Sequence, residues 1–261
     1  MKIAYQKIQK TILDRYKINA RVLPRRQTTD PYQIMVSEIM LQQTQVDRVI
    51  PKYLNFLELF PTLQSLADAD KTKLLTARSG LGYNSRALNL QKAAQAIVHE
   101  HKNIFPQTKD ELIKLPGIGP YTAGAICAFA YNQDVTVIDI NIKRVLIHLL
   151  HLDSNINPKD LEKIVADILP RWQSKTRYNA LMDYWALVLT SKKTGIKSPT
   201  QSKFQGSARQ VRGNLIKHLT KFGPIGIDEA KQKFYHDDFD KIITKMIKEW
   251  TIEVKNKIIS L

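Results

Sequence analysis

Apolar residues recur at intervals of three and four along most of the first 190 residues, the spacing of one face of an α-helix. Cap signals separate these runs. Thr108 and Glu111 form a capping box, and Asn157-Pro158 places a proline in the first turn of a helix. No strand is predicted before residue 250, so the pattern predicts an all-α core. The expected helices are two consecutive ones within 34–57, one at 86–99, one after Thr108, one after Pro158 and one at about 178–190.

The pattern changes near residue 191. Residues 192–227 contain eight Lys or Arg and no Asp or Glu, and Gly195, Pro199 and Gly206 interrupt the pattern. Helical stretches follow at about 207–221, 228–234 and 237–249. Two short apolar runs then flank Lys255-Asn256-Lys257, which is typical of a β-hairpin. We therefore predict a catalytic core at 1–191, a basic linker at 192–206 and a small winged-helix-like (α+β) DNA-binding domain at 207–261.

The net charge of the chain indicates what kind of molecule it binds. The chain has 40 Lys and Arg against 24 Asp and Glu, a net charge of +16, which favours a nucleic acid partner over a membrane surface or solubility tuning. No apolar run approaches the ~20 residues of a membrane span, and the first residues lack the apolar core of a signal peptide. A single cysteine, Cys127, excludes a disulfide framework and a Cys-rich metal site. We expect a cytoplasmic monomer (nucleoid-associated in a prokaryote), with no membrane contact.

The segment 115–125 ends one expected helix and begins the next within a few residues. Glycine permits a positive φ and a close approach of backbone to phosphate, so Gly117 and Gly119 predict a tight hairpin. N–H groups at the start of the next helix, around Thr122, can bind that phosphate. We interpret the segment as a DNA-binding helix-hairpin-helix. The alternative is a plain corner between two helices.

An acidic residue, Asp139, stands between apolar residues just before an expected helix and shortly after the hairpin. Such a residue is commonly an N-cap. Near a phosphate-binding turn, a buried carboxylate is also well placed to face a sugar that becomes positively charged. Both interpretations stay open.

A second acidic residue, Glu38, lies among apolar neighbours on an expected helix, where a charge is costly unless it has a partner or a role. Burial would raise its pKa and let it donate a proton near neutral pH. The alternative is a buried structural salt bridge. The nearby amides of Gln42, Gln43 and Gln45 suit the reading of base edges or the gap left by a flipped base. Otherwise they form a solvated face.

These segments together resemble the helix-hairpin-helix (HhH-GPD) DNA glycosylase superfamily, closest to the MutY-type adenine glycosylases. The resemblance runs from about Leu23 to about Leu189 with its motifs in order. It also includes Leu-Pro-Arg-Arg at 23–26, Gly-Leu-Gly-Tyr at 80–83 and Asn-Ala-Leu-Met-Asp at 179–183.

The resemblance implies two helical lobes with a base pocket between them. It implies that Glu38 protonates the purine and helps to activate water, and that Asp139 stabilises the oxocarbenium sugar or bonds to it. Tyr121 and Asn141 match residues that support these two acids. The matched base-binding positions are Arg26 and Gln43, and the matched DNA-binding positions are Gln42, Gln45, Tyr83, Asn84, Gly117, Gly119 and Thr122.

Three departures concern the substrate and cofactor. Related enzymes carry four cysteines for an iron–sulfur cluster after the segment that ends at Leu189, and none occurs there. The pair Tyr83-Asn84 replaces two tyrosines, and asparagine there resembles the thymine-mismatch glycosylases. The usual domain that checks for 8-oxoguanine is missing. We expect no metal, no iron–sulfur cluster and no other cofactor, with a monovalent cation at the hairpin as the one candidate ligand.

Three functions remain as hypotheses. The first is a monofunctional glycosylase that binds double-stranded DNA with a mispaired or damaged base and removes adenine opposite 8-oxoguanine or guanine. The second is a thymine or uracil mismatch glycosylase, which Asn84 and Ile140 motivate. The third is a non-catalytic DNA-binding protein on a glycosylase scaffold.

Overall fold

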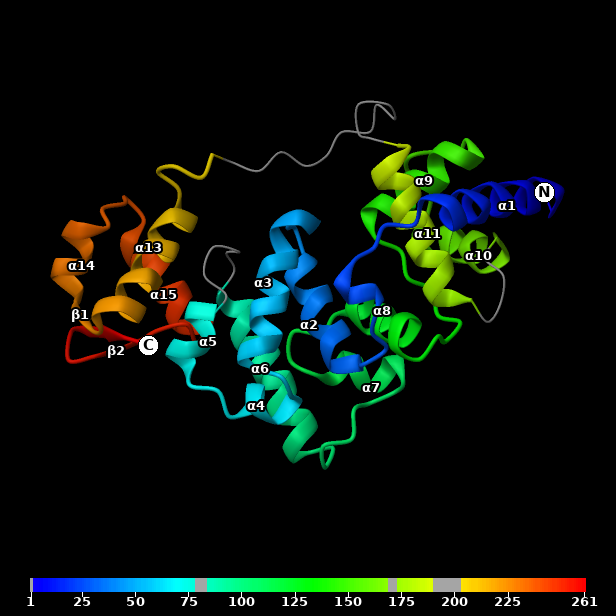
Figure 1. Cartoon of the computed structure of the whole chain (residues 1–261). Helices are drawn as coiled ribbons and strands as arrows, with labels where there is room; N and C mark the ends of the chain where they lie inside the picture. Colours follow the sequence, from blue (N-terminus) through cyan, green and yellow to red (C-terminus); the bar gives the residue numbers. More distant parts are fainter. Residues whose placement is uncertain (1, 78–83, 169–172, 190–202) are drawn as a thin grey trace. The chain divides into compact units, whose positions relative to one another are not determined.

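The computed structural model describes residues 2–77, 84–168, 173–189 and 203–261. They form two compact units (Figure 1). Unit 1 comprises residues 1–38, 107–114 and 118–199, and unit 2 comprises residues 39–106, 115–117 and 200–261. The described part of the chain is predominantly helical, as predicted.

Unit 1 is organised around α11 (Ser174–Leu187), which packs against α1 (Lys2–Asn19), α8 (Pro120–Ala130) and α9 (Ile140–Leu150). α1 also contacts α10 (Pro158–Ile168), and proline begins α8 and α10, where a missing N–H costs nothing. The unit also contains the 3-10 helix η1 (Pro24–Arg26), most of α2 (Pro31–Leu41) and α7 (Lys109–Lys114).

Tyr178 of α11 fixes the extended segment that leads to α9. Its hydroxyl donates a hydrogen bond to the carbonyl of Val135 at 2.7 Å and accepts one from the amide of Val137 at 3.0 Å. The Tyr178 side chain is fully buried, so its hydroxyl needs these two hydrogen bonds in place of bonds to water. Asp139, two residues after Val137, is thereby held at the start of α9.

Unit 2 joins the helices that follow α2 to the C-terminal part of the chain. α4 (Leu63–Ala67) and α5 (Lys71–Ala77) both pack on α6 (Asn84–His99), and α3 (Val46–Leu59) packs on α5. The fully buried side chains of this unit include Phe56, Phe60, Leu66, Leu74, Leu75, Leu90 and Phe239.

The C-terminal region has the predicted winged-helix-like content. Its helices are α13 (Ala208–Phe222), α14 (Ile227–Lys233) and α15 (Phe239–Lys248). The predicted terminal hairpin is confirmed as β2 (Glu253–Lys255) and β3 (Ile258–Ser260), which pair antiparallel.

One strand was missed. β1 (Ile225–Gly226) pairs with β3 to give a three-stranded sheet of order β1-β3-β2, so the expectation of no strand before residue 250 is wrong. Two residues are too short to show an alternating pattern, and a strand of that length forms only because β3 supplies its hydrogen bonds.

The C-terminal helices belong to the same compact unit as residues 39–106. α13 packs on α5, and the Lys92 ammonium lies 4.8 Å from the centre of the Trp250 ring, a cation–π contact. The predicted division placed residues 207–261 in a domain apart from residues 1–191. The contacts instead group the C-terminal helices with α3–α6. Most of the predicted linker at 192–206 lies outside the described residues.

The other predicted helices are present, and their ends differ from the predicted ones by a few residues. The capping box is present, because the Thr108 hydroxyl accepts a bond from the amide of Glu111 at 3.3 Å and the Glu111 carboxylate accepts one from the amide of Thr108 at 3.4 Å. α11 begins four residues before the expected Tyr178, at Ser174. Cys127 is fully buried in α8, as expected of a packed core residue.

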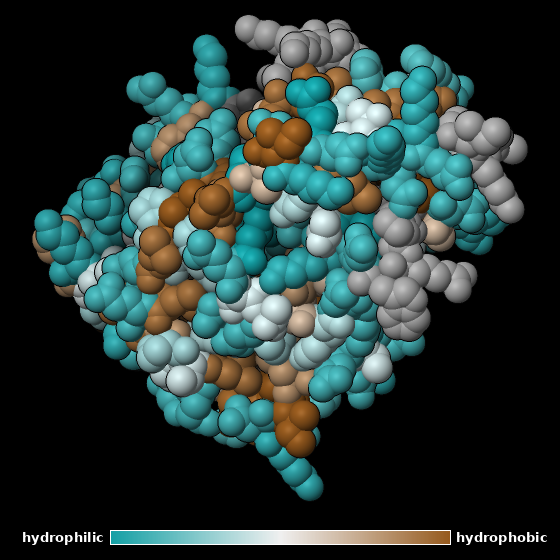
Figure 2. Space-filling model, turned by 45° about the vertical axis from the view of Figure 1, so that its right-hand side comes forward, coloured by the Kyte–Doolittle hydropathy of each residue, from teal (hydrophilic) through white to brown (hydrophobic). Residues whose placement is uncertain are grey.

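Hydrophilic residues cover most of the face seen in Figure 2, between smaller hydrophobic patches. Within the described ranges, no helix is both long enough and apolar enough to pass through a lipid bilayer.

Candidate functional site

Glu38 is a buried acid on α2. Asp30 accepts a hydrogen bond from the Tyr32 amide at 2.9 Å and so satisfies a donor in the first turn of this helix. The residues around Glu38 on α2 are almost all buried, so its side chain is only 3% exposed. A carboxylate in such a place needs a partner.

Arg25 of η1 is that partner. Its Nη1 donates to Glu38 Oε1 at 3.1 Å, and the Arg25 side chain is only 10% exposed. The structural alternative stated for Glu38, a buried salt bridge, is therefore present. Arg25 is also a residue that the sequence analysis did not select.

Tyr121 of α8 lies against the same carboxylate. Burial raises the pKa of Tyr121 well above its usual range, and the negative charges of Glu38 and Asp139 raise it further. Its hydroxyl is hydrogen-bonded to Glu38, so it remains a protonated donor at any physiological pH.

Asp139 is the N-cap of α9, as one of its two interpretations predicted. Its Oδ1 accepts a hydrogen bond from the Ile142 amide at 2.6 Å, and its Oδ2 accepts one from Asn141 Nδ2 at 3.4 Å. Asn141 in turn accepts a bond from Arg144 Nη1 at 3.4 Å. Asp139 is thus fixed in position by its own helix.

The two acids titrate under opposing influences. Burial raises the pKa of Glu38 most, the Arg25 guanidinium lowers it, the Asp139 charge raises it, and the Tyr121 hydrogen bond lowers it. Burial also raises the pKa of Asp139, against hydrogen bonds from Ile142 and Asn141 that lower it. The balance of these influences raises the pKa of both acids, and a raised pKa favours the proton-donating form of a carboxyl group.

Unit 1 therefore brings Glu38, Tyr121, Asp139 and Asn141 together from three helices, although Glu38 and Asp139 are far apart in sequence. The arrangement supplies a proton donor and a second carboxylate that can face a developing positive charge.

Arg26 has a different environment from Arg25. Its Nη1 and Nη2 donate to Asp183 at 2.7 and 2.8 Å, and the amide of Arg21 also donates to Asp183 at 3.0 Å. Burial alone would raise the pKa of Asp183, but these hydrogen bonds outweigh it and the pKa is lowered. The predicted base-binding residue is thus engaged in a bidentate ion pair with a residue that the sequence analysis gave no role.

The glutamines lie beyond the end of α2, in unit 2. Gln43 is exposed and has a positive φ of 58°, and Gln45 is the exposed N-cap residue of α3. The carbonyl of Gln42 accepts a hydrogen bond from Arg86 Nη1 at 2.6 Å. Asn84 begins α6, and its predicted neighbour Tyr83 lies outside the described residues.

The two hairpin glycines differ in what they require. Gly117 has a φ of +75°, and a Cβ there would lie 2.6 Å from Cβ of Asn89. Gly119 has a φ of −86° and open space where a Cβ would point, so a positive φ explains glycine at position 117 and not at position 119. Close approach of backbone to a ligand remains as the reason for glycine at this position. Thr122, in the first turn of α8, is buried.

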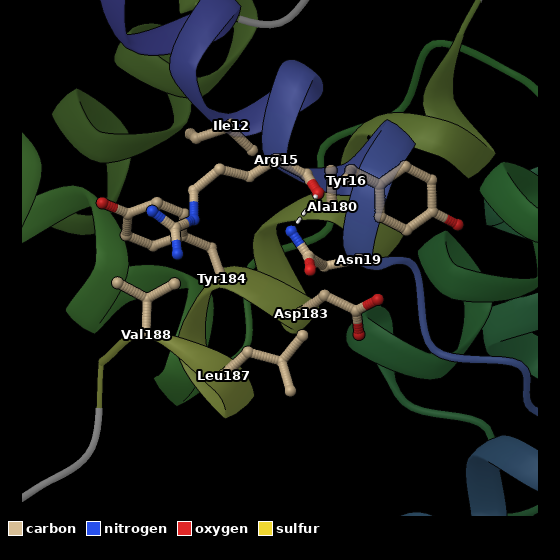
Figure 3. Close-up of a pocket in the computed structure, with 9 residues that line it drawn as sticks. All are labelled: Ile12, Arg15, Tyr16, Asn19, Ala180, Asp183, Tyr184, Leu187 and Val188. Carbon is tan, nitrogen blue, oxygen red and sulfur yellow. Dashed lines mark hydrogen bonds between the residues drawn. The ribbon is translucent and has the colours of Figure 1, made fainter.

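A separate pocket of about 210 Å³ lies between α1 and α11 in unit 1 (Figure 3). Arg15, Asn19 and Tyr184 line it, and Asn19 donates to the carbonyl of Arg15 at 3.2 Å. Asp183 is on its wall, but neither Glu38 nor Asp139 is. Within the described ranges, no group of three or more His, Cys, Asp or Glu side chains could hold a metal ion.

Arg25 could not be singled out from the sequence, because Leu-Pro-Arg-Arg offers two adjacent arginines and no pattern shows which one turns toward Glu38. A buried acid without a cation at helical spacing was the available signal that a partner must come from elsewhere in the chain.

A predominantly helical fold with a buried acid, a half-buried second acid and a glycine hairpin defines a helix-hairpin-helix protein with an acidic centre. Comparisons with known proteins narrow this class. Residues 36–171 match the model of the HhH-GPD superfamily of base excision DNA repair proteins. The chain therefore belongs to this superfamily.

Two relatives and one solved structure illustrate the likeness. The chain is 42% identical over 183 residues to an adenine DNA glycosylase of Buchnera aphidicola subsp. Baizongia pistaciae, which covers 68% of this chain and 52% of that protein. It is 35% identical over 227 residues to an adenine DNA glycosylase of Mycolicibacterium smegmatis, 78% of each chain. The fold resembles that of a thermostable thymine-DNA glycosylase with a TM-score of 0.67 and 24% identity, over 73% of this chain and 89% of that one. The chain spans about half the length of the Buchnera relative.

Proposed function

We propose that this protein is a DNA glycosylase that flips an adenine mispaired with 8-oxoguanine or guanine out of the duplex and hydrolyses its bond to the sugar. The observation that carries the proposal is the cluster of Glu38, Tyr121 and Asp139 in unit 1, with the charge of Asp139 acting on Glu38. The relatives named adenine DNA glycosylase support the choice of base.

The chemistry needs one proton donor and one anion. Adenine is a poor leaving group until a ring nitrogen is protonated, so protonated Glu38 gives its proton to the base. The glycosidic bond then breaks with its electron pair going to adenine, and the sugar becomes an oxocarbenium ion. Ionised Asp139 stabilises that cation. Water attacks the sugar and transfers a proton to Glu38, which restores the acid.

Replacing Asp139 with asparagine tests the proposal. Asparagine also caps helices well, so α9 should keep its start while the negative charge is lost. We expect nearly unchanged affinity for a duplex with adenine opposite 8-oxoguanine, and excision slower by roughly a hundredfold or more in single turnover. Asp134→Asn, which removes an acid paired with Arg177 in the same unit, is the matched control and should retain excision. Near-full activity of the Asp139 variant would remove this residue from the mechanism.

A second candidate substrate is thymine or uracil opposite guanine. Asn84 and Ile140 motivate it, and Asn84 stands where the resemblance departs from the adenine enzymes. Incubation with a panel of duplexes, one for each mispair, followed by alkali cleavage separates the two substrates. Activity on the pyrimidine mispairs alone would overturn the adenine proposal. A third candidate, a non-catalytic DNA-binding protein, predicts binding without cleavage of any duplex in the panel.

We also propose that the region 207–261 contacts DNA beside the lesion. It has 11 Lys and Arg against 7 Asp and Glu, and Lys248 on α15 and Lys257 in the hairpin are exposed. Each phosphate contact contributes about one unit to the slope of log affinity against log salt. The double variant Lys248→Gln, Lys257→Gln should therefore lower that slope by about two. An unchanged slope would contradict the proposal.

A further inference from the structure

Two adjacent arginines of η1 bind two different acids. Arg26 forms its bidentate pair with Asp183, while Arg25 turns toward Glu38. Arg25 is therefore outside the ion-pair network that joins η1 to Asp183 of α11, and its ion pair among the described residues is with Glu38.

Among the residues that the structure describes, Glu38 is the one acid paired with Arg25. Its Nη2 lies 3.6 Å from the sulfur of Met182, and its guanidinium is 5.9 Å from the centre of the Phe129 ring. Its Nε is buried without a hydrogen-bond partner among the described residues. A buried guanidinium with so few polar contacts depends on its carboxylate, and that carboxylate has the Tyr121 hydroxyl as a second partner.

The groups that face Glu38 act in opposite directions. Arg25 and the Tyr121 hydroxyl stabilise its ionised form, while burial and Asp139 favour its protonated form. A residue that first donates a proton to a base and then recovers one from water needs both forms within reach near the working pH. Without the cation, burial and the charge of Asp139 would shift the balance further toward the protonated form.

We propose that Arg25 is a positioning residue for base excision: its guanidinium orients the Glu38 carboxylate and stabilises its ionised form, so that Glu38 can take back a proton from the attacking water. This inference rests on the proposed glycosylase function.

The test compares Arg25→Met, which removes the charge but keeps an apolar side chain, with Arg25→Lys, which keeps the charge but loses the planar fork. The control is Arg177→Met. Arg177 is similarly buried, but its ion pair is with Asp134, at 2.6 Å, and not with Glu38. Folding of each variant is checked by circular dichroism and thermal unfolding.

The first measurement is a ¹³C NMR titration of the Glu38 carboxyl in the free protein, with its signal assigned from Glu38→Gln. Loss of the Arg25 charge should raise the pKa of Glu38 by about one unit or more, while Arg25→Lys and Arg177→Met leave it near the wild-type value. An unchanged titration in a folded Arg25→Met protein would overturn the inference.

The second measurement is the pH profile of single-turnover excision. Excision requires protonated Glu38, so its rate falls as pH rises through the pKa of that group. Arg25→Met should move this falling limb to higher pH and lower the plateau rate roughly tenfold, because water activation is impaired. If Arg25→Met kept the falling limb at the wild-type pH and the plateau at the wild-type rate, the inference would be overturned. The titration needs no substrate, so failure of the proposed function would appear separately, as wild-type protein that excises no base.

Discussion

Replacing Gly117 with alanine tests why the hairpin needs glycine at this position. Gly117 has a φ of +75°, which costs an L-residue about 1–2 kcal/mol. The added Cβ would also lie 2.6 Å from Cβ of Asn89 on α6, closer than packed carbon atoms tolerate. Overpacking of this kind costs typically ~1–3 kcal/mol. The two effects together predict a loss of about 2–5 kcal/mol in the free energy of unfolding.

Gly119 provides a control within the same hairpin. Its φ is −86° and nothing lies within 4 Å of the position that a Cβ would take, so Gly119→Ala meets neither strain nor a clash. It should cost at most about 1 kcal/mol, because alanine is a poorer N-cap residue than glycine at the start of α8. If close approach of phosphate explains this glycine, the same variant should bind duplex DNA more weakly. The hairpin would then contain one glycine required for folding and one required for binding.

The assay is urea unfolding of both variants, with the steric part isolated by a second substitution. Asn89→Gly removes the atom that the new Cβ would strike, so in the double variant the clash should vanish while the cost of positive φ remains. We expect the double variant to recover about 1–3 kcal/mol relative to the sum of the single variants. Gly117→Ala as stable as wild type, or a double variant with no recovery, would refute this account of the hairpin.

Three further predictions concern other parts of the molecule. The hydroxyl of Tyr121 cannot form the imine that a lysine would form with the sugar, so borohydride should trap little covalent protein–DNA adduct. Tyr121→Lys should increase trapping. Efficient trapping by the unmodified protein would contradict this prediction. Deletion of residues 200–261 uncovers the face of α5 that packs on α13, so the shortened chain should unfold at a lower temperature than the full chain, and an unchanged transition would show that this contact contributes nothing to stability. The pKa of Asp183 is lowered in the folded state, so its contribution to stability is present above its unfolded pKa and is lost as pH falls through its folded pKa. Arg26→Met should flatten this acid dependence in thermal unfolding measured from neutral to low pH, and an unaltered dependence would remove the pair as its cause.

Local patterns predicted local structure well. Thr108 with Glu111 marked the start of α7, and Pro158 marked the start of α10, because caps and first-turn prolines act within a few residues of their own position. The same reasoning identified Glu38 and Asp139 as acids in apolar surroundings. What the sequence could not supply was the set of partners that each acid has in space.

Long-range contacts account for the errors. β1 forms because β3 pairs with it, and nothing within Ile225-Gly226 signals a strand. Arg25 and Arg26 have the same side chain and adjacent positions, so only the tertiary structure separates the partner of Glu38 from the partner of Asp183. The grouping of the C-terminal helices with α3–α6 likewise depends on packing between segments that are well over a hundred residues apart, as α5 and α13 are.

That grouping sets an order of events during synthesis. Residues 39–106 leave the ribosome before residues 118–199, while the helices that complete their unit come after residue 200. At ~5–20 residues per second, translation of the intervening hundred residues takes roughly 5–20 s. During that interval the apolar side of α5 that later meets α13 has no covering segment, and a nascent chain with exposed apolar surface is open to aggregation or to capture by a chaperone. The discontinuous unit therefore makes the yield of folded protein sensitive to translation speed in this stretch, even where the final stability is unaffected.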